Sequence, residues 1–259
     1  MTTSKKITKV SGGEESPQKS TFVPTTEAKG KATRLRIFSI LLWVLGIAAE
    51  IGAILVEMKS VKPMETSAWV WIISLIVVDL ILVIIGSQLW KKANRFDPAS
   101  EQDKAKFFLQ NQLGVIISVI AFLPLVIFVF TNKDLDGKQK GILGGIAAVA
   151  LIAAGIASAD FNPPSKEQYS EQTSRVEELT GGTNNVYWTK SGTKYHIYDD
   201  CPRINTSRTE EIFSGTVAQA RELKNITELC KVCEHRAEKE NALHEGAEAM
   251  TPGEAETTE

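Results

Sequence analysis

The sequence predicts an α-helical membrane protein with four transmembrane helices, followed by a small α+β domain. Three observations support this fold class. Four long apolar runs occupy the middle of the 259-residue chain. Charge is segregated along it: residues 1–36 carry 8 basic and 3 acidic side chains, and residues 160–259 carry 11 and 19. All three cysteines lie after residue 200. The overall net charge of −2 therefore hides three segments of different character.

Each apolar run is long enough to cross a bilayer as a helix. The runs cover residues 37–56, 69–89, 113–130 and 141–159, and their only charged residues are Glu50 and Asp79. About 20 residues at a rise of 1.5 Å match a hydrocarbon core of roughly 30 Å. Buried helices of a soluble protein are the alternative, but four of them would need a larger soluble shell than this chain has. Residues 34–160 are therefore predicted to form a four-helix transmembrane domain.

Basic residues beside the spans predict the orientation. The side that holds both chain ends carries 11 Lys or Arg in its flanks, and the opposite side carries 5. Cytoplasmic loops have the excess of Lys and Arg in membrane proteins. We expect an integral protein of a bacterial cell membrane with both termini in the cytoplasm. Residues 1–33 are polar and basic, and are expected to be a disordered tail.

Glu50 and Asp79 are the candidates for chemistry within the membrane section. A carboxylate in hydrocarbon costs several kcal/mol, so intramembrane acids face the bundle interior and often serve ion or proton pathways. The alternative is a protonated acid that bonds to a neighbouring helix. These residues make a small transporter or channel the second functional hypothesis, although the chain shows no internal repeat of the kind common in transporters.

Small residues in the fourth span indicate close helix packing. Gly141-x-x-x-Gly145 and Gly144-x-x-x-Ala148 leave room for another helix to approach. Packing within the bundle is the first interpretation. A homo-oligomer formed through Gly141 and Gly145 is the alternative.

Polar segments separate and follow the predicted domains. Asn162-Pro163-Pro164 ends the fourth helix, because proline lacks the amide donor and restricts the residue before it. Residues 161–185 are predicted to be a polar linker or solvated helix. Residues 241–259 are acidic and are expected to be a disordered tail.

Residues 186–240 hold the most informative pattern. Residues 186–189 and 194–198 are predicted strands joined by a Ser191-Gly192 turn, and residues 216–224 a predicted helix. His196-x4-Cys201 is followed, after 28 residues, by Cys230-x2-Cys233. Two close pairs suit a tetrahedral zinc ion, and a domain of this size buries too little apolar surface to fold securely alone. A structural zinc site is therefore predicted.

The same residues allow two alternatives to a zinc site. Cys230 and Cys233 as a redox dithiol would need a βαβ context, which is not visible, and unrelated buried cysteines would not explain the spacing. The fourth ligand is His196 or His235. We prefer His196 because it completes two similar chelates, whereas His235 falls within a helix expected from Glu234 onward. His244 lies in the polar tail and is expected to be solvated.

Part of this pattern resembles a known family. Tyr195-His196, Asp200-Cys201-Pro202, residues 216–221 and Cys230-Lys-Val-Cys233 are similar to the Ada-type metal-binding fold, a zinc module appended to varied bacterial proteins, including some nucleases. The resemblance implies a small α+β domain with zinc at His196, Cys201, Cys230 and Cys233. The DNA-repair members use four cysteines, one of them a methyl acceptor, so His196 at the first position argues against alkyl transfer. The membrane section resembles uncharacterised bacterial multi-pass membrane proteins.

The charge of the module argues against nucleic-acid binding. Residues 186–236 hold 8 basic and 7 acidic side chains without a Lys/Arg cluster, and zinc with three thiolates adds one negative charge. The sequence therefore predicts a non-enzymatic membrane protein whose cytoplasmic zinc module serves protein interaction or sensing. A DNA-directed or alkyl-damage-sensing protein is the third hypothesis, by analogy with the family alone.

Overall fold

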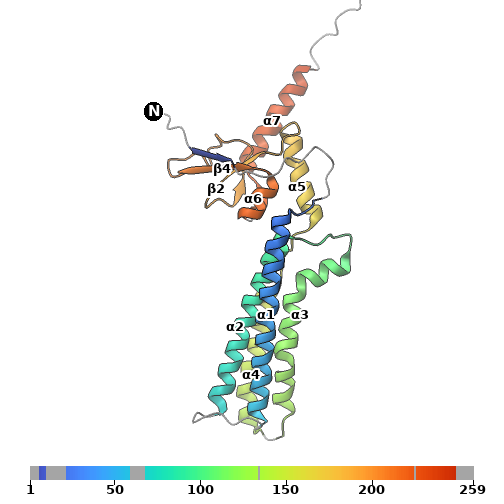
Figure 1. Ribbon diagram of the computed structural model, residues 1–259, viewed down its shortest axis with the longest axis vertical. Helices are drawn as coiled ribbons and strands as arrows, with labels where there is room; N and C mark the ends of the chain where they lie inside the picture. Colours follow the sequence, from blue (N-terminus) through green and yellow to red (C-terminus); the bar gives the residue numbers. More distant parts are fainter. Residues whose placement is uncertain (1–5, 10–21, 59–67, 134, 225, 249–259) are drawn as a thin grey trace, which may run out of the picture. The chain divides into compact units, whose positions relative to one another are not determined.

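The computed structural model describes residues 6–9, 22–58, 68–133, 135–224 and 226–248 (Figure 1). These residues form two compact units. One unit is Pro24–Ser165, and the other combines Met1–Val23 with Lys166–Glu259. The first holds the apolar helices and the second holds the cysteines.

Four helices form the membrane unit. They are α1 (Thr26–Glu57), α2 (Ala68–Phe96), α3 (Lys104–Thr131) and α4 (Gly137–Ser158). Each is long and apolar enough to cross a membrane, which confirms that the four predicted runs form helices of spanning length. Successive helices run in opposite directions, so α1 begins at the end of the bundle where α4 finishes (Figure 1).

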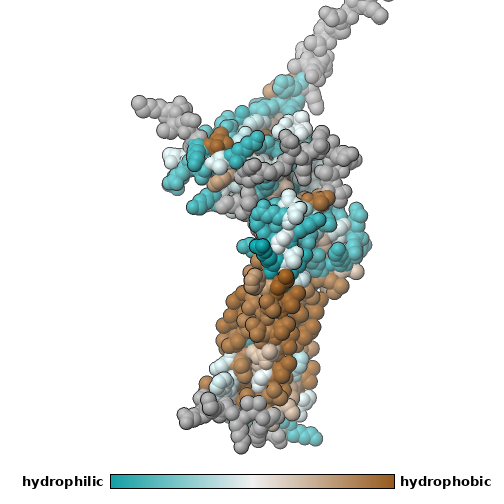
Figure 2. Space-filling model, viewed as in Figure 1, coloured by the Kyte–Doolittle hydropathy of each residue, from teal (hydrophilic) through white to brown (hydrophobic). Residues whose placement is uncertain are grey.

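The outer surface of this unit is apolar. Figure 2 shows a continuous hydrophobic covering over much of the bundle. Exposed apolar side chains occur on all four helices: Ile37, Phe38, Leu41 and Val44 on α1, Val77, Val78, Ile81 and Ile85 on α2, Ile120 and Ile127 on α3, and Val149, Ile152 and Ile156 on α4. In water this surface would be an aggregation site, whereas lipid chains are a compatible solvent.

Hydrogen bonds between hydroxyl groups join three of the helices inside the bundle. Ser158 on α4 donates to Ser87 on α2 at 2.9 Å, and Ser118 on α3 donates to Ser158 at 3.0 Å. A side chain at Gly114 would meet the Ser87 hydroxyl at 2.9 Å, so this glycine permits the close approach of α2 and α3. Small and hydroxylated residues at such contacts are typical of membrane helix packing.

The glycines of α4 divide between two faces of the helix. A Cβ at Gly144 would lie 2.5 Å from Cζ of Phe130, whereas Gly141 and Gly145 have nothing within 4 Å. Gly144 therefore serves packing within the bundle. The homo-oligomer through Gly141 and Gly145 stays a prediction.

This difference predicts unequal effects of two alanine substitutions. We expect Gly144→Ala to lower the free energy of unfolding by about 1 kcal/mol, at the lower end for overpacking, because the half-exposed Phe130 ring can shift. Gly145→Ala is the matched control and should leave stability within about 0.5 kcal/mol of wild type. Thermal unfolding in detergent micelles measures both, and equal losses would contradict the assignment of faces.

The second unit is a small α+β module. Its helices are α5 (Lys166–Leu179), α6 (Val217–Lys224) and α7 (Lys231–Glu248). Its strands are β1 (Lys6–Lys9), β2 (Val186–Thr189), β3 (Lys194–Tyr195), β4 (Glu211–Gly215) and β5 (Glu228–Leu229). One sheet has the order β1-β4-β2, with β1 parallel and β2 antiparallel to β4, and β3 pairs with β5 in parallel.

Several predicted boundaries were wrong. Residues 1–33 are not wholly a tail, because Lys6–Lys9 pairs with β4 and α1 begins at Thr26, whose preceding Thr25 hydroxyl accepts from the Ala28 N–H at 3.1 Å. Residues 10–21 lie outside the described residues. Helix α7 starts at Lys231 rather than at residue 234 and continues to Glu248, into the predicted acidic tail. Residues 249–259 also lie outside the described residues.

Helix α5 is part of the module rather than a solvated spacer. Tyr169, Thr173, Val176 and Leu179 are buried, at the spacing of one helix face. Val176 joins the apolar core that contains Val186, Trp188, Tyr195, Val217, Ala220 and Ile226. The spacing of these four residues is present in the sequence of residues 166–179. The mostly polar composition of the segment led instead to the prediction of a solvated spacer.

A candidate metal centre in the second unit

Strand β3 and its partner strands position His196. The backbone N–H and C=O of His196 pair with those of Tyr187 at 2.7 Å in both directions, an isolated antiparallel bridge that links the residue after β3 to β2. The hairpin turn is closed by the Gly192 N–H, which donates to the Thr189 carbonyl at 3.2 Å. His196 is 4% exposed, so its imidazole is directed into the module.

Cys201 lies in the loop that follows the hairpin. Its carbonyl accepts from the N–H groups of Ile204 and Asn205 at 3.0 and 2.8 Å. These bonds turn the chain sharply after the cysteine and hold its thiol inside, at 2% exposure.

The second cysteine pair lies at the start of α7. The Cys230 N–H donates to the Tyr195 carbonyl at 2.9 Å, which ties this cysteine to the strand that precedes His196. Cys230 directly precedes the helix and Cys233 lies in its first turn. Thiolates at a helix N-terminus are favoured by the dipole and the free amide groups.

The four predicted ligands meet at one buried point. The donor atoms of His196, Cys201, Cys230 and Cys233 all lie within 4.8 Å of one another. Nδ1 of His196 is 3.6 Å from Sγ of Cys233. Two ligands of one tetrahedral zinc, at about 2.0 Å for nitrogen and 2.3 Å for sulfur, are separated by about 3.6 Å. The group is therefore positioned to bind a metal ion of this size through Nδ1 and three sulfurs.

Burial has opposite consequences for the imidazole and the thiol. It lowers the pKa of His196 to about 4, so the ring is neutral at pH 7 and its lone pair is available. Burial also raises the pKa of the Cys233 thiol to about 12, against the smaller lowering effect of the Tyr198 and Ile197 N–H groups. A thiolate in this site therefore requires a compensating positive charge, which a bound dication supplies.

His235 lies away from the site. Its side chain is 88% exposed, and its Nδ1 is 3.9 Å from a carboxylate oxygen of Glu238. His244, the third histidine of the chain, is also exposed. The connection between the parallel strands β3 and β5 contains β4 and α6, so a strand–helix–strand segment precedes Cys230. The cysteine pair lies against His196 and Cys201, two further donors that a redox dithiol does not require.

An ion-pair cluster joins the two ligand-bearing segments at the surface. Arg236 on α7 donates to Asp200 at 2.8 Å and to Glu240 at 2.9 Å, and its guanidinium lies 4.0 Å from the centre of the Tyr198 ring. The Tyr198 hydroxyl donates to Glu240 at 2.6 Å. Asp200 precedes Cys201, so the cluster holds the first cysteine beside α7. Sequence reasoning missed this cluster, because its two halves, Tyr198 with Asp200 and Arg236 with Glu240, are more than 30 residues apart.

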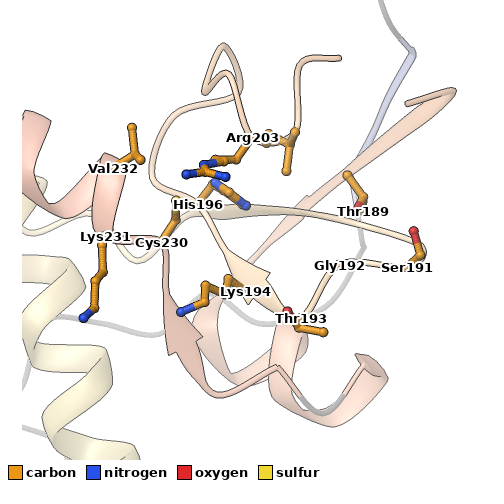
Figure 3. A pocket seen from close by; sticks show the side chains of 11 residues that line it. Thr189, Ser191, Gly192, Thr193, Lys194, His196, Arg203, Cys230, Lys231 and Val232 are labelled. Atoms are coloured by element: carbon orange, nitrogen blue, oxygen red, sulfur yellow. The ribbon is translucent and has the colours of Figure 1, made fainter. Parts of the chain in front are cut away.

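A cavity of about 480 Å³ lies beside the four ligands (Figure 3). His196 and Cys230 contribute to its wall. Its polar lining comes from the hairpin, the loop after Cys201 and the start of α7: Thr189, Ser191, Thr193, Lys194, Arg203 and Lys231. Lys194 is already paired with Glu228 at 2.7 Å. The cavity thus combines cationic and hydroxyl groups with no acidic residue in its lining.

The two intramembrane acids belong to the other unit. Glu50 is 3% exposed and accepts the Leu125 N–H at 3.1 Å, next to Pro124, which lies inside α3. Asp79 is 1% exposed. Both acids therefore face the bundle interior, as the sequence predicted.

Together the fold and the site define a class of protein: one with four helices long and apolar enough to span a membrane, and a separate module with four residues positioned to bind a metal ion. A scan against protein-family models finds no match, and comparisons with curated proteins and with solved structures find none either. The assignment of function therefore depends on the chemistry of the site.

Proposed function

We propose that this chain is an integral membrane protein that presents a structural zinc module on the cytoplasmic side of the membrane for the recognition of another protein. The observation that carries the proposal is the set of four buried donors within 4.8 Å of one another. Three sulfurs and one imidazole nitrogen are the ligands that zinc prefers at a closed structural site. The similarity to the Ada-type fold supports the same metal and the same structural role.

Recognition of a protein fits the site better than catalysis. A catalytic zinc keeps one position open for water or substrate, whereas four protein donors complete a tetrahedron. The adjacent cavity, with Lys194, Arg203 and Lys231 in its lining, suits carboxylate side chains of an acidic partner segment. The module lacks the Lys/Arg excess that affinity for a nucleic-acid backbone requires. The excess of Lys and Arg in the span flanks on the side that holds both termini supports the cytoplasmic orientation.

Metal content of the purified full-length protein tests the proposal. We expect one zinc per chain in wild type and almost none in a Cys230→Ser, Cys233→Ser double variant, because two of four ligands are lost. His235→Ala is the matched control: it removes an exposed imidazole two residues after Cys233 in the chain and should retain full zinc. Another metal, or zinc retained by the double variant, would contradict the structural zinc site.

Cross-linking in native membranes tests the recognition role separately. The wild type and His235→Ala should give the same cross-linked protein through α7 and the hairpin, and the double cysteine variant should not. If the cross-linked species persists after zinc is lost, the module is not the recognition element, even though the zinc site stands.

A further inference from the structure

The pair of acids within the bundle is independent of the zinc module and is not used by the proposed function. Glu50 and Asp79 are the only charged residues of the four apolar runs, so no cation in the spans can pair with them. An ionised carboxylate without a partner is strongly disfavoured in hydrocarbon. Each of these acids must therefore be stabilised by a hydrogen bond, a proton or a bound ion.

The two acids lie close together across the α1–α2 contact. A Cβ at Gly46 of α1 would be 2.5 Å from Oδ1 of Asp79 on α2, so the Asp79 carboxyl rests directly against the α1 backbone. Glu50 lies four residues after Gly46, which places it on the same face one turn further along α1. The bare glycine surface thus makes room for the Asp79 carboxyl beside Glu50.

The acids differ in how they are satisfied. Glu50 has the Leu125 N–H as a donor at 3.1 Å. Asp79 is 1% exposed, and neither carboxyl oxygen has a hydrogen-bond partner among the described residues. A buried polar side chain without a hydrogen-bond partner destabilises the folded state, because apolar neighbours cannot replace the hydrogen bonds it makes with water. A role confined to joining helices would give Asp79 a donor or acceptor on a neighbouring helix.

We propose that Asp79 and Glu50 form an intramembrane binding site for a monovalent cation, either a proton or an alkali ion, which the site exchanges with the medium. One bound cation neutralises one of the two negative charges. It also gives the Asp79 carboxyl oxygens a partner, either through a shared proton or as ligands of a metal ion. Proton and alkali ion are alternative sources of the same positive charge. This site lies within the membrane unit and goes beyond the recognition function proposed for the zinc module.

Carbodiimide labelling of the full-length protein in proteoliposomes tests the site. An apolar carbodiimide reacts with neutral carboxyl groups, and peptide mapping by mass spectrometry locates the product. We expect labelling of Asp79 or Glu50 that falls several-fold as the pH rises. Glu50 is the only titratable side chain in the four apolar runs besides Asp79. The pH dependence of labelling within the bundle therefore reports on this pair. Suppression by Na⁺ or K⁺ at constant pH, with choline as the control salt, identifies an alkali-ion site, and no suppression identifies a proton site.

A stability measurement serves as the second readout, because it does not require the reagent to reach the site. The unfolding temperature of wild type in detergent should fall as the pH rises, and an alkali ion that binds should restore it. Asp79→Asn should weaken both responses, because it leaves only the Glu50 carboxyl, which already has the Leu125 N–H as a donor. Equal pH and salt responses in wild type and Asp79→Asn, with no pH-dependent labelling of either acid, would overturn the proposal.

Two glycine substitutions provide matched variants on α1. Gly46→Ala places a methyl group against Oδ1 of Asp79 and should displace the carboxyl, which reduces the labelling and the salt response. In Gly52→Ala the new methyl group would lie 3.5 Å from Cδ1 of Leu75, an ordinary contact, so both readouts should match wild type. Identical behaviour of these two variants would show that the Gly46–Asp79 contact is not part of the site.

Discussion

Removal of the metal should unfold the second unit while the four apolar helices stay folded. Without a cation, three buried sulfurs and a buried imidazole lie together in one of the module's two small cores. In zinc-finger peptides, binding of structural zinc contributes about 10–16 kcal/mol, nearly all of which is folding free energy. The membrane unit has its own core and no ligand in the site, so it should not respond.

Hydrogen exchange of the full-length protein, followed by mass spectrometry, measures this effect unit by unit. Peptides from residues 186–240 should lose protection in Cys233→Ser and in chelated wild type, and regain it when zinc is restored to wild type. Peptides from α1 to α4 serve as the internal reference, and His235→Ala as the control variant. Full protection of the module without metal would mean that its apolar core suffices.

Trp188→Ala should have the second largest effect, a loss of about 3–5 kcal/mol from the free energy of unfolding of the module. Trp188 is 1% exposed, stacks on Phe213 with ring centres 6.4 Å apart, and lies in the core between the sheet and helices α5 and α6. Its truncation removes the largest buried side chain of a small core, and the short strands around it cannot close the cavity.

The same exchange experiment, at saturating zinc, compares this variant with a control on the opposite face of β2. Tyr187→Phe keeps the aromatic ring and should change stability by less than about 0.5 kcal/mol. We expect Trp188→Ala to retain one zinc per chain, because the four ligands remain. A loss below about 1 kcal/mol would indicate that the metal, rather than this apolar core, holds the sheet against the helices.

The sequence predicts the membrane spans well because hydrophobic length is a local property. A run of about 20 uncharged residues needs a spanning helix whatever its neighbours are. Helix ends depend on capping instead, and the start of α1 at Thr26 follows from the Thr25 hydroxyl within a polar segment that composition alone assigns to a tail. The pairing of Lys6–Lys9 with β4 could not be predicted, because its partner strand lies some 200 residues away.

The spacing of the cysteines also allowed the metal site to be predicted from the sequence. The spacing did not decide whether His196 or His235 is the fourth ligand. Cys233 and His235 are two residues apart on one helix, so their side chains point about 200° apart and cannot both reach the same ion. The helix starts at Lys231, which turns Cys233 inward and leaves His235 exposed. His196 joins the three sulfurs because the hairpin bridge to Tyr187 directs it inward.

By itself, then, the sequence determined how many helices can cross a membrane, that two acids lie within them, and which residue types can hold a metal. These properties follow from composition and short spacings, which act along the chain. Only the tertiary structure decided that Asp79 rests against Gly46 without a hydrogen-bond partner among the described residues, that Glu50 receives the Leu125 N–H, and that α5 belongs to the core of the module. Such contacts join segments far apart in sequence, so they exist only once the helices and strands have packed.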